Sequence, residues 1–166
     1  MSAQPSSDAA HFRATLGRFA TGVTVITTQA ADGSPVGLTV SSFNSVSLNP
    51  PLVLWSLSQS ASSLPALRQC ERYVIHVLSA RQVALARNFA TGKPSQRFVG
   101  IDLVRAPGGT LMLADEGAAW FECRNRSHYP EGDHLIMVGE VEHCGYSNAP
   151  PLVFHAGGFD LTPKQA

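Results

Sequence analysis

The chain alternates short runs of β-branched and apolar residues with clusters of turn-forming residues. Runs rich in Val, Ile, Leu and Thr cover 23–28, 36–43, 45–48, 52–57, 73–78, 101–105, 110–113, 118–126 and 134–143. β-Branched side chains suit the pleated surface of a sheet, so each run predicts a strand. Turn sequences such as Asp32-Gly33 and Gly108-Gly109 separate the runs, which is typical of antiparallel hairpins.

The first helical signal lies near the N-terminus. Phe12, Leu16 and Phe19 recur at spacings of four and three, which places them on one face of a helix. Asp8 precedes them and can cap the first turn. The pattern predicts a helix that ends at Gly22.

Two further helices are predicted between strands. Ser63 opens a short one over 63–70, and Pro65 stands in its first turn, where a missing N–H costs nothing. Ser79 and Gln82 have the spacing of a capping box for a helix that runs to about Ala90.

Roughly eight short strands with two or three helices predict a mainly β protein, a closed or nearly closed antiparallel β-barrel. Most connections are too short for the crossover helix that parallel strands need. We expect a disordered N-terminal segment over 1–10 and a single domain over 11–166, because no linker or repeat divides the chain. The first ten residues lack the basic and apolar regions of a signal peptide, and no window of 18 apolar residues predicts a membrane span.

Charge narrows the choice of partners. The 12 basic and 12 acidic residues balance to zero, so nothing favours binding to nucleic acid or to an anionic membrane. Charged residues make up only 14% of the chain, which predicts an oligomer whose interface covers part of the surface. The three cysteines have no CxxC spacing and are expected to be reduced, as in a cytoplasmic protein.

Several common chemistries have no support in the sequence. No phosphate-binding loop, no G-x-G-x-x-G turn and no G-x-S-x-G elbow is present. None of the six histidines is paired at helical spacing, and the odd separation of His134 and His143 predicts that they face opposite sides of one strand. We therefore expect no metal site.

Hydroxyl side chains concentrate in two places. The segment 37–47 carries five of them in a strand-like stretch, and Ser56, Ser58, Ser60 and 62–63 form a second cluster beside a predicted helix start. Small hydroxyl residues let a flat ring approach the backbone and offer donors to carbonyl or phosphate oxygens. Taken alone, the pattern also fits ordinary Ser-rich edge strands and turns.

Five short motifs occur in a fixed order. They are the Phe-Ala-Thr-Gly-Val-Thr-Val opening within 19–28, the hydroxyl stretch 39–47, Pro-Pro-Leu-Val at 50–53, Arg-Phe at 97–98, and Gly-Asp-His at 132–134. Each is common by itself. Together they resemble the short-chain flavin reductase family, the FMN-binding split-barrel reductases that serve two-component flavin monooxygenases.

The resemblance runs from about Phe12 to Leu161 and implies both a fold and an activity. The implied fold is a six-stranded antiparallel Greek-key split barrel that works as a homodimer. The implied activity is NAD(P)H:flavin oxidoreduction, in which NADH or NADPH reduces FMN or FAD and the reduced flavin passes to a partner monooxygenase. A non-catalytic flavin-binding or carrier protein on the same barrel remains the alternative, because a fold does not fix a function.

The resemblance also implies which residues contact the flavin. The residues expected to bind it are Thr39, Val40, Ser41, Ser42, Ser56 and Leu57 around the ring, Ser60 and Ser63 near the phosphate, and Arg97 with Phe98. Arg97 would supply positive charge toward a phosphate, although a surface ion pair would equally explain it. The other polar residues in this set could be solvated loop or strand groups.

The Gly132-Asp133-His134 motif is expected to serve the nicotinamide. Gly132 permits a tight turn, Asp133 accepts hydrogen bonds that fix it, and His134 begins a strand from which it would bond NAD(P)H. A plain turn followed by a strand-end histidine is the structural alternative. Because the cofactors carry out the hydride transfer themselves, the sequence requires no particular catalytic side chain.

Overall fold

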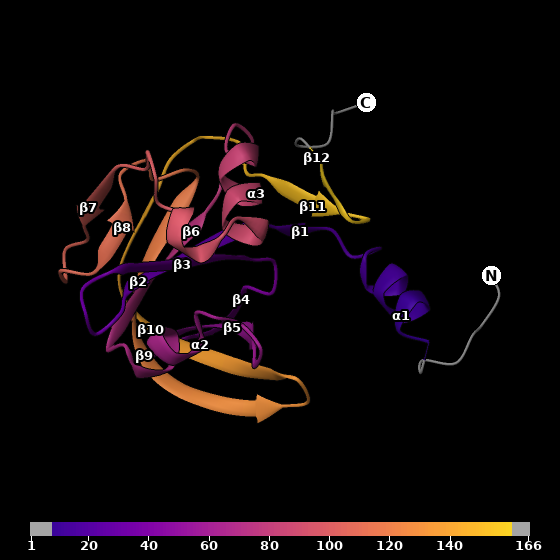
Figure 1. Ribbon diagram of the computed structural model, residues 1–166, viewed down its shortest axis with the longest axis horizontal. Helices are drawn as coiled ribbons and strands as arrows, with labels where there is room; N and C mark the ends of the chain where they lie inside the picture. Colours follow the sequence, from indigo (N-terminus) through magenta and orange to yellow (C-terminus); the bar gives the residue numbers. More distant parts are fainter. Residues whose placement is uncertain (1–7, 161–166) are drawn as a thin grey trace.

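The computed structural model describes residues 8–160 (Figure 1). Three α-helices and one 3₁₀-helix are present in this range: α1 Ala9–Leu16, α2 Leu64–Gln69, α3 Val83–Thr91 and the 3₁₀-helix Pro94–Gln96. The strands in order are β1 Thr21–Gly22, β2 Thr24–Gln29, β3 Pro35–Val40, β4 Asn44–Leu48, β5 Pro51–Ser58, β6 Arg72–Val77, β7 Leu103–Arg105, β8 Leu111–Leu113, β9 Ala119–Glu131, β10 His134–Tyr146, β11 Val153–His155 and β12 Gly158–Asp160.

The main sheet is antiparallel and curls on itself. Its seven strands lie in the order β3-β2-β6-β9-β10-β5-β4, so β3 and β4 form its two edges. The strands β5 and β6 follow each other in the chain, yet the long β9–β10 hairpin lies between them in the sheet. The mainly β, antiparallel architecture is therefore as predicted, with seven strands in this sheet where six were expected. Two small sheets, β1-β11-β12 and β7-β8, flank it.

The interior of the curled sheet is the principal core. Trp55 and Tyr73 meet edge to face with ring centroids 5.5 Å apart, and neither residue is accessible to solvent. Around them pack inward side chains from every long strand of the sheet, together with Leu67 of α2. The buried residues of this cluster, here called the barrel core, are Ile26, Val40, Val53, Trp55, Leu57, Leu67, Tyr73, Ile75, Cys123, Leu135 and Met137.

A second core lies on the outer face of the sheet. Val25 of β2 packs there with Ala86 and Phe89 of α3 and with Leu113 of β8. Residues 24–28 of β2 are consequently buried on both faces, which explains why this run is continuously apolar or β-branched rather than alternating.

Several element boundaries depart from the prediction; β9, for example, continues to Glu131 beyond the predicted 118–126. Helix α1 ends at Leu16, and Gly17 caps it, so Phe19 lies beyond the helix instead of on its last turn. The run predicted as one strand over 36–43 is a strand only to Val40, because residues 41–43 turn the chain into β4. The side chains of Phe12, Leu16 and Phe19 remain exposed.

The N-terminal prediction falls mostly outside the described residues. Of the segment 1–10 that was expected to be disordered, residues 9–10 form the first turn of α1, and the side chain of Asp8 caps it by accepting bonds from Ala10 N and His11 N. No helix among the described residues is long and apolar enough to cross a membrane.

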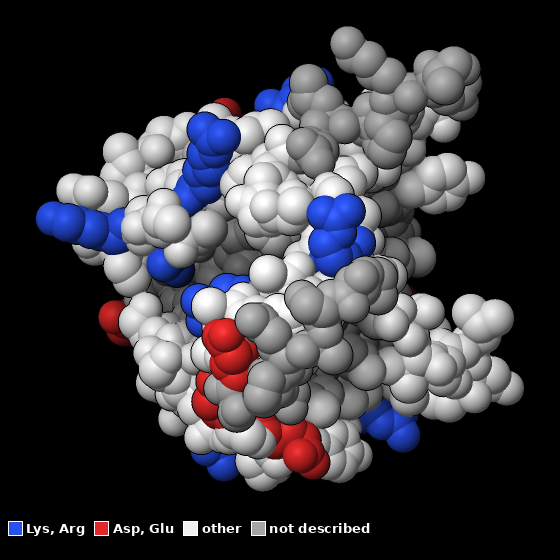
Figure 2. Space-filling view, turned by 90° about the vertical axis from the view of Figure 1, so that its right-hand side faces the viewer, with Lys and Arg blue, Asp and Glu red and all other residues white. Residues whose placement is uncertain are grey.

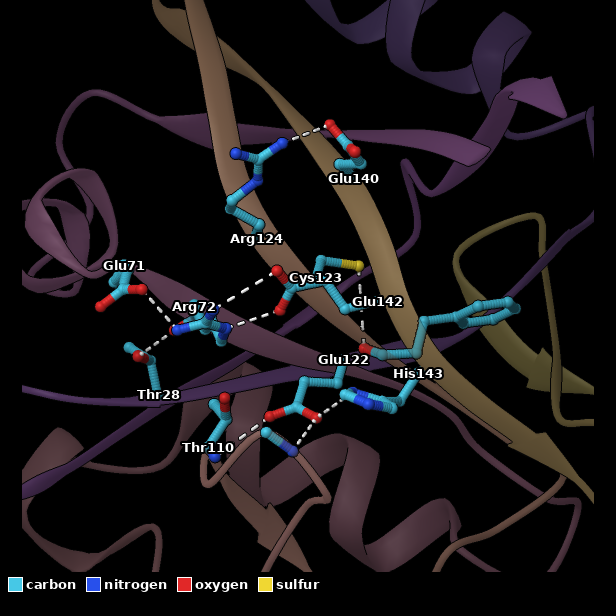
Figure 3. A network of polar contacts seen from close by, with 12 residues as sticks. Thr28, Glu71, Arg72, Thr110, Glu122, Cys123, Arg124, Glu140, Glu142 and His143 are labelled. Atoms are coloured by element: carbon cyan, nitrogen blue, oxygen red, sulfur yellow. Dashed lines mark hydrogen bonds and ion pairs between the residues drawn. The ribbon is translucent and has the colours of Figure 1, made fainter. Parts of the chain in front are cut away.

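A buried carboxylate holds the β7–β8 hairpin against the sheet. Glu122 of β9 accepts hydrogen bonds from the backbone N–H groups of Gly108, at 2.7 Å, and Thr110, at 3.1 Å (Figure 3). The Nδ1 atom of His143 on β10 lies 3.0 Å from the same carboxylate, and the Glu122 side chain has no exposed surface. Burial alone would raise the pKa of Glu122, but the hydrogen bonds from Thr110, Gly108 and His143 outweigh it and lower the pKa.

The contact between His143 and Glu122 corrects one expectation. The odd spacing of His134 and His143 predicted opposite faces of the strand, but the β9–β10 ladder shifts register between Val141 and His143. This bulge turns His143 to the outer face, which His134 also occupies because its neighbour Leu135 points into the barrel core. No cluster of three or more metal-ligating side chains occurs within residues 8–160.

We predict that Glu122→Gln lowers the free energy of unfolding at pH 7 by about 1.5–3 kcal/mol, because the amide presents a donor where the hairpin already supplies donors. Since the pKa of Glu122 is lowered in the folded protein, its contribution is complete above the unfolded pKa and is lost as the pH falls through the folded pKa.

Urea denaturation at pH 7 and at about pH 3.5 measures both effects, and the difference between wild type and variant should shrink at the lower pH. Glu116→Gln, at an exposed carboxylate, is the control and should change little. A constant difference at the two pH values would contradict the assignment.

Candidate functional site

The two edges of the main sheet meet at a seam that a serine closes. Ser42, just after β3, accepts a hydrogen bond from Ser56 N of β5 at 2.9 Å, and its hydroxyl donates to Ser56 O at 3.4 Å. The edge strands β3 and β4 lie at opposite ends of the strand order, so no backbone ladder joins them. Edge strands have main-chain groups without ladder partners, so the seam can offer backbone donors and acceptors to a ligand.

A cavity of about 180 Å³ opens beside the end of β3. Three of the predicted flavin-binding residues, Thr39, Val40 and Ser41, line it. The Thr39 hydroxyl donates to Ala86 O of α3 at 2.7 Å, and Val40 belongs to the barrel core. These two residues therefore offer a ligand mainly their backbone, whereas the exposed Ser41 also offers its hydroxyl.

The opposite wall of this cavity comes from the C-terminal hairpin. Phe154 of β11 and Phe159 of β12 line it, with ring centroids 5.4 Å apart. Sequence analysis did not single out either aromatic residue, although the apolar segment from Leu152 onward, with Gly157-Gly158 inside it, is typical of a hairpin. Flat, apolar walls on one side and a strand edge on the other are the surroundings that an aromatic heterocycle requires.

An unsatisfied hydroxyl group lies next to this wall. Thr21 of β1 pairs with Phe154, and its buried Oγ1 atom has no hydrogen-bond partner among the described residues. A buried polar atom without a partner is costly, although Thr21 itself is not one of the residues that line the cavity. The residues that do line the cavity, with the backbone and hydroxyl of Ser41 and the rings of Phe154 and Phe159, fit a flat ring with polar edges, such as a flavin.

The predicted serines between β5 and the start of α2 differ in their surroundings. Ser56 and Ser58 point away from the barrel core, whereas Leu57 between them is fully buried in it and could reach a ligand only through its backbone. The hydroxyl groups of Ser58 and Ser60 are 2.9 Å apart. Ser63 is buried at the start of α2 and makes no capping bond with its side chain.

The Gly-Asp-His motif forms the tip of the β9–β10 hairpin. Gly132 has φ = 58°, the left-handed conformation that glycine adopts without strain. The carboxylate of Asp133 lies 2.7 Å from His134 Nδ1, and an ionised carboxylate there accepts a proton-bearing Nδ1–H, which favours the tautomer with Nε2 free to accept. The hydrogen bond from His134 lowers the pKa of Asp133. In the ladder, His134 lies directly opposite Ser58.

Two predicted residues have side chains engaged within the fold. Arg97 donates to Gly92 O at 3.0 Å and to Gly37 O at 2.7 Å, and burial lowers its pKa. Phe98 packs edge to face on Phe89 of α3, with centroids 4.9 Å apart. The contacts of Arg97 are neither the expected phosphate contact nor the surface ion pair considered as its alternative. A phosphate role for Arg97 stays a prediction for its remaining N–H groups.

The structure thus arranges the predicted residues in two groups along β5. Thr39 to Ser42 gather with Ser56 at the seam, and Ser58, Ser60 and the motif 132–134 gather at the far end of the strand. Three larger hollows, of about 310, 540 and 590 Å³, contain none of the predicted residues. We locate the site at the smaller cavity because the end of β3, with three of the predicted residues, and the aromatic residues of the C-terminal hairpin meet there.

The surface charge does not explain how an anionic cofactor would be attracted to the site. Figure 2 shows the face that carries α1 and the C-terminal hairpin, with Lys and Arg side chains scattered over it and acidic side chains gathered in its lower half. This face has no broad basic patch to attract phosphate at long range, so an anionic cofactor would rely on individual hydroxyl and N–H groups.

Comparisons with known proteins agree with this geometry. The family model described as flavin reductase like domain matches residues 16–162. The chain is 42% identical over 154 residues to the FMN reductase (NADH) SmoA of Agrobacterium fabrum, covering 93% of this chain and 86% of that protein. It spans about half the length, 49%, of a probable flavin reductase of Rhizobium meliloti to which it is 39% identical.

Two solved structures are also similar. The NADH:FAD oxidoreductase SgcE6 of Streptomyces globisporus, in complex with NAD and FAD fragments, superposes with a TM-score of 0.91 at 32% identity, over 100% of this chain and 99% of that one. The styrene monooxygenase flavin reductase of Pseudomonas putida S12 gives a TM-score of 0.83 at 30% identity, over 93% and 99% of the two chains.

We predict that Ser42→Ala lowers the free energy of unfolding by about 0.5–1.5 kcal/mol, because it leaves Ser56 N without its partner at the seam. Ser41→Ala is the matched control, since the described residues show no hydrogen bond for its side chain, and it should change stability little. Chemical denaturation compares the two variants. Equal effects would mean that Ser42 does not hold the seam.

Proposed function

This chain belongs to the flavin reductase like domain family, and on that basis we propose that it is an NAD(P)H:flavin oxidoreductase. It reduces FMN or FAD by hydride transfer from NADH or NADPH and supplies the reduced flavin to a flavin-dependent monooxygenase. The observation that carries the proposal is 42% identity, across 93% of the chain, to a protein named as an NADH-dependent FMN reductase.

The protein's part in the reaction is to seat and orient the two cofactors. The nicotinamide and the flavin supply the hydride chemistry between themselves when both are bound. Backbone groups of Thr39 to Ser41 would face the edge of the flavin ring, and Phe154 and Phe159 would cover it and exclude water. Removing water from the ring strengthens every hydrogen bond made to it there.

His134 is the candidate for contact with the nicotinamide. Its ring is oriented by the carboxylate of Asp133, and Nε2 is available to accept a hydrogen bond. The carboxamide group of a nicotinamide carries an N–H₂ donor that such an acceptor would recognise. The role of His134 is therefore binding and orientation, with no proton transfer required of it.

A partner enzyme follows from the chemistry of the product. Reduced flavin reacts with oxygen in solution, so a reductase that releases it needs an enzyme that receives it. The styrene monooxygenase flavin reductase, which is similar over nearly the whole chain, is named as the reductase of such a system. On the basis of that similarity, we propose that a monooxygenase also receives the reduced flavin from this chain.

Exposed apolar residues support a homodimer. Helix α1 has no buried residue, stands away from the barrel in Figure 1, and is 50% exposed at Phe12 and 58% exposed at Leu16. Leaving an apolar helix face in water forfeits the free energy of its burial. A second copy that covers α1 would recover it and would account for the low content of charged residues.

A cytoplasmic location completes the proposal. Cys70, Cys123 and Cys144 are all free thiols, which a reducing compartment maintains.

The proposed activity is tested by adding the protein to FMN or FAD with NADH or NADPH under anaerobic conditions. We expect the oxidised flavin absorbance near the visible maximum to bleach at a rate proportional to protein concentration. Comparing the four flavin and nicotinamide pairs also establishes the preferences. Flavin binding without bleaching in any pair would indicate a flavin carrier instead.

We predict that His134→Ala lowers kcat/KM for NAD(P)H by about 10- to 100-fold, since a hydrogen bond to a strongly polar group contributes roughly 1.5–3 kcal/mol. Flavin affinity, measured by titration, should stay close to that of wild type because other residues carry it. If flavin affinity falls as far as nicotinamide efficiency, His134 belongs to the flavin site or to the core.

We also predict that light scattering at micromolar concentration gives about twice the chain mass of 17.7 kDa. The double substitution Phe12→Asp and Leu16→Asp should shift the protein toward the monomer, because it places charge on the apolar face of α1. Arg13→Asp, on the same exposed helix, is the control for charge alone. A fully active monomer of wild type would contradict the proposal.

A further inference from the structure

One residue outside the recognised motifs contacts all three residues of the Gly132-Asp133-His134 turn. Gln59 follows β5 directly, and its backbone N–H donates to Asp133 O at 2.9 Å. Its side-chain Nε2 donates to Gly132 O at 3.1 Å and to His134 O at 3.3 Å. Three consecutive carbonyl groups of the turn thus accept hydrogen bonds from one amino acid.

The turn needs such a partner because the sheet does not provide one. The β9–β10 ladder closes with Glu131 opposite His134, so the carbonyl groups of Gly132 and Asp133 lie outside it. The β5–β10 ladder likewise ends with Ser58 opposite His134. Gln59 is one residue beyond that last pair, and from there it reaches the exposed tip that the two ladders leave free.

The chemistry of the amide group suits the contact. An amide nitrogen carries two hydrogens, and both are directed to carbonyl oxygens here. These bonds hold the backbone of residues 132–134, and that backbone carries both the Asp133 carboxylate and the His134 ring whose Nδ1 it contacts. The orientation of the imidazole therefore depends on a chain of contacts that begins at Gln59.

We propose that Gln59 is a positioning residue that holds the His134 turn in its nicotinamide-binding geometry. The inference rests on the proposed function. Gln59 also lies in the loop that carries Ser60 and Ser63, the residues expected near the flavin phosphate. Gln59 therefore connects the loop expected to bind the flavin phosphate with the turn expected to bind the nicotinamide, so the two sites share one hydrogen-bonded connection.

The test removes the hydrogen-bond donor of the Gln59 side chain while keeping the side chain nearly the same size. Gln59→Glu is nearly isosteric but presents carboxylate oxygens to the carbonyl groups, whereas Gln59→Lys restores a donor. The backbone bond from residue 59 to Asp133 remains in both variants. We expect Gln59→Glu to raise KM for NAD(P)H about 10-fold, with kcat and flavin affinity near wild type and partial recovery in Gln59→Lys.

A matched control and a double variant separate positioning from general stability. Gln29 donates its side-chain amide to Gly33 O at 2.9 Å in the β2–β3 turn, so Gln29→Ala removes a similar contact far from the motif. It should leave KM for NAD(P)H unchanged. In the His134→Ala background, Gln59→Glu should add little, because it acts through His134. Additive losses would overturn the proposal.

A spectroscopic measurement tests the inference independently of activity. The ¹⁵N chemical shifts of the His134 ring at neutral pH distinguish protonation at Nδ1 from protonation at Nε2. We expect the Nδ1–H form in wild type and a mixture in Gln59→Glu. An unchanged His134 signal in Gln59→Glu refutes positioning, whereas an expected shift in a protein that bleaches no flavin refutes only the proposed function.

Discussion

The closure of the barrel across a seam without a backbone ladder is the constraint on which the remaining structure depends. The edge strands β3 and β4 do not pair with each other, so the sheet is held closed by side chains. Val40 from one edge, Val53 from the strand beside the other edge, and the Trp55–Tyr73 pair belong to one buried cluster. The Ser42–Ser56 contact adds the polar link. Burial of apolar surface is non-directional, so it closes the sheet without using the main-chain groups of the edge.

This mode of closure explains where a ligand can bind. In the middle of the sheet, the N–H and C=O groups of each strand are hydrogen-bonded to the neighbouring strands. The strands β2 and β6 are also buried on both faces, so a ligand cannot reach them. The end of β3 is different, because its outer edge has no ladder partner and the C-terminal hairpin brings two aromatic rings to face it. Scaffold and site are therefore built from the same strands but from different parts of them.

The polar contacts on the outer face of the sheet contribute unequally to stability. Glu122 is buried and accepts two backbone N–H groups and a histidine, so its removal leaves donors unsatisfied. The ion pairs of Arg72 with Glu142 and of Arg124 with Glu140, seen in Figure 3, are partly exposed and contribute little by comparison. The β7–β8 hairpin thus depends on one carboxylate more than on the visible salt bridges.

The sequence by itself determined the local structure and the family. Turn glycines, β-branched runs and the Pro65 helix start act over a few residues, and the strands between 23 and 143 and helix α2 were predicted from them. What only the tertiary structure decided are contacts between distant segments. The wall from Phe154 and Phe159, the commitment of Arg97 to backbone carbonyl groups and the reach of Gln59 to the Gly132 turn arise from strand order. The bulge that turns His143 outward is a register shift between two strands, and neither spacing nor propensity encodes it.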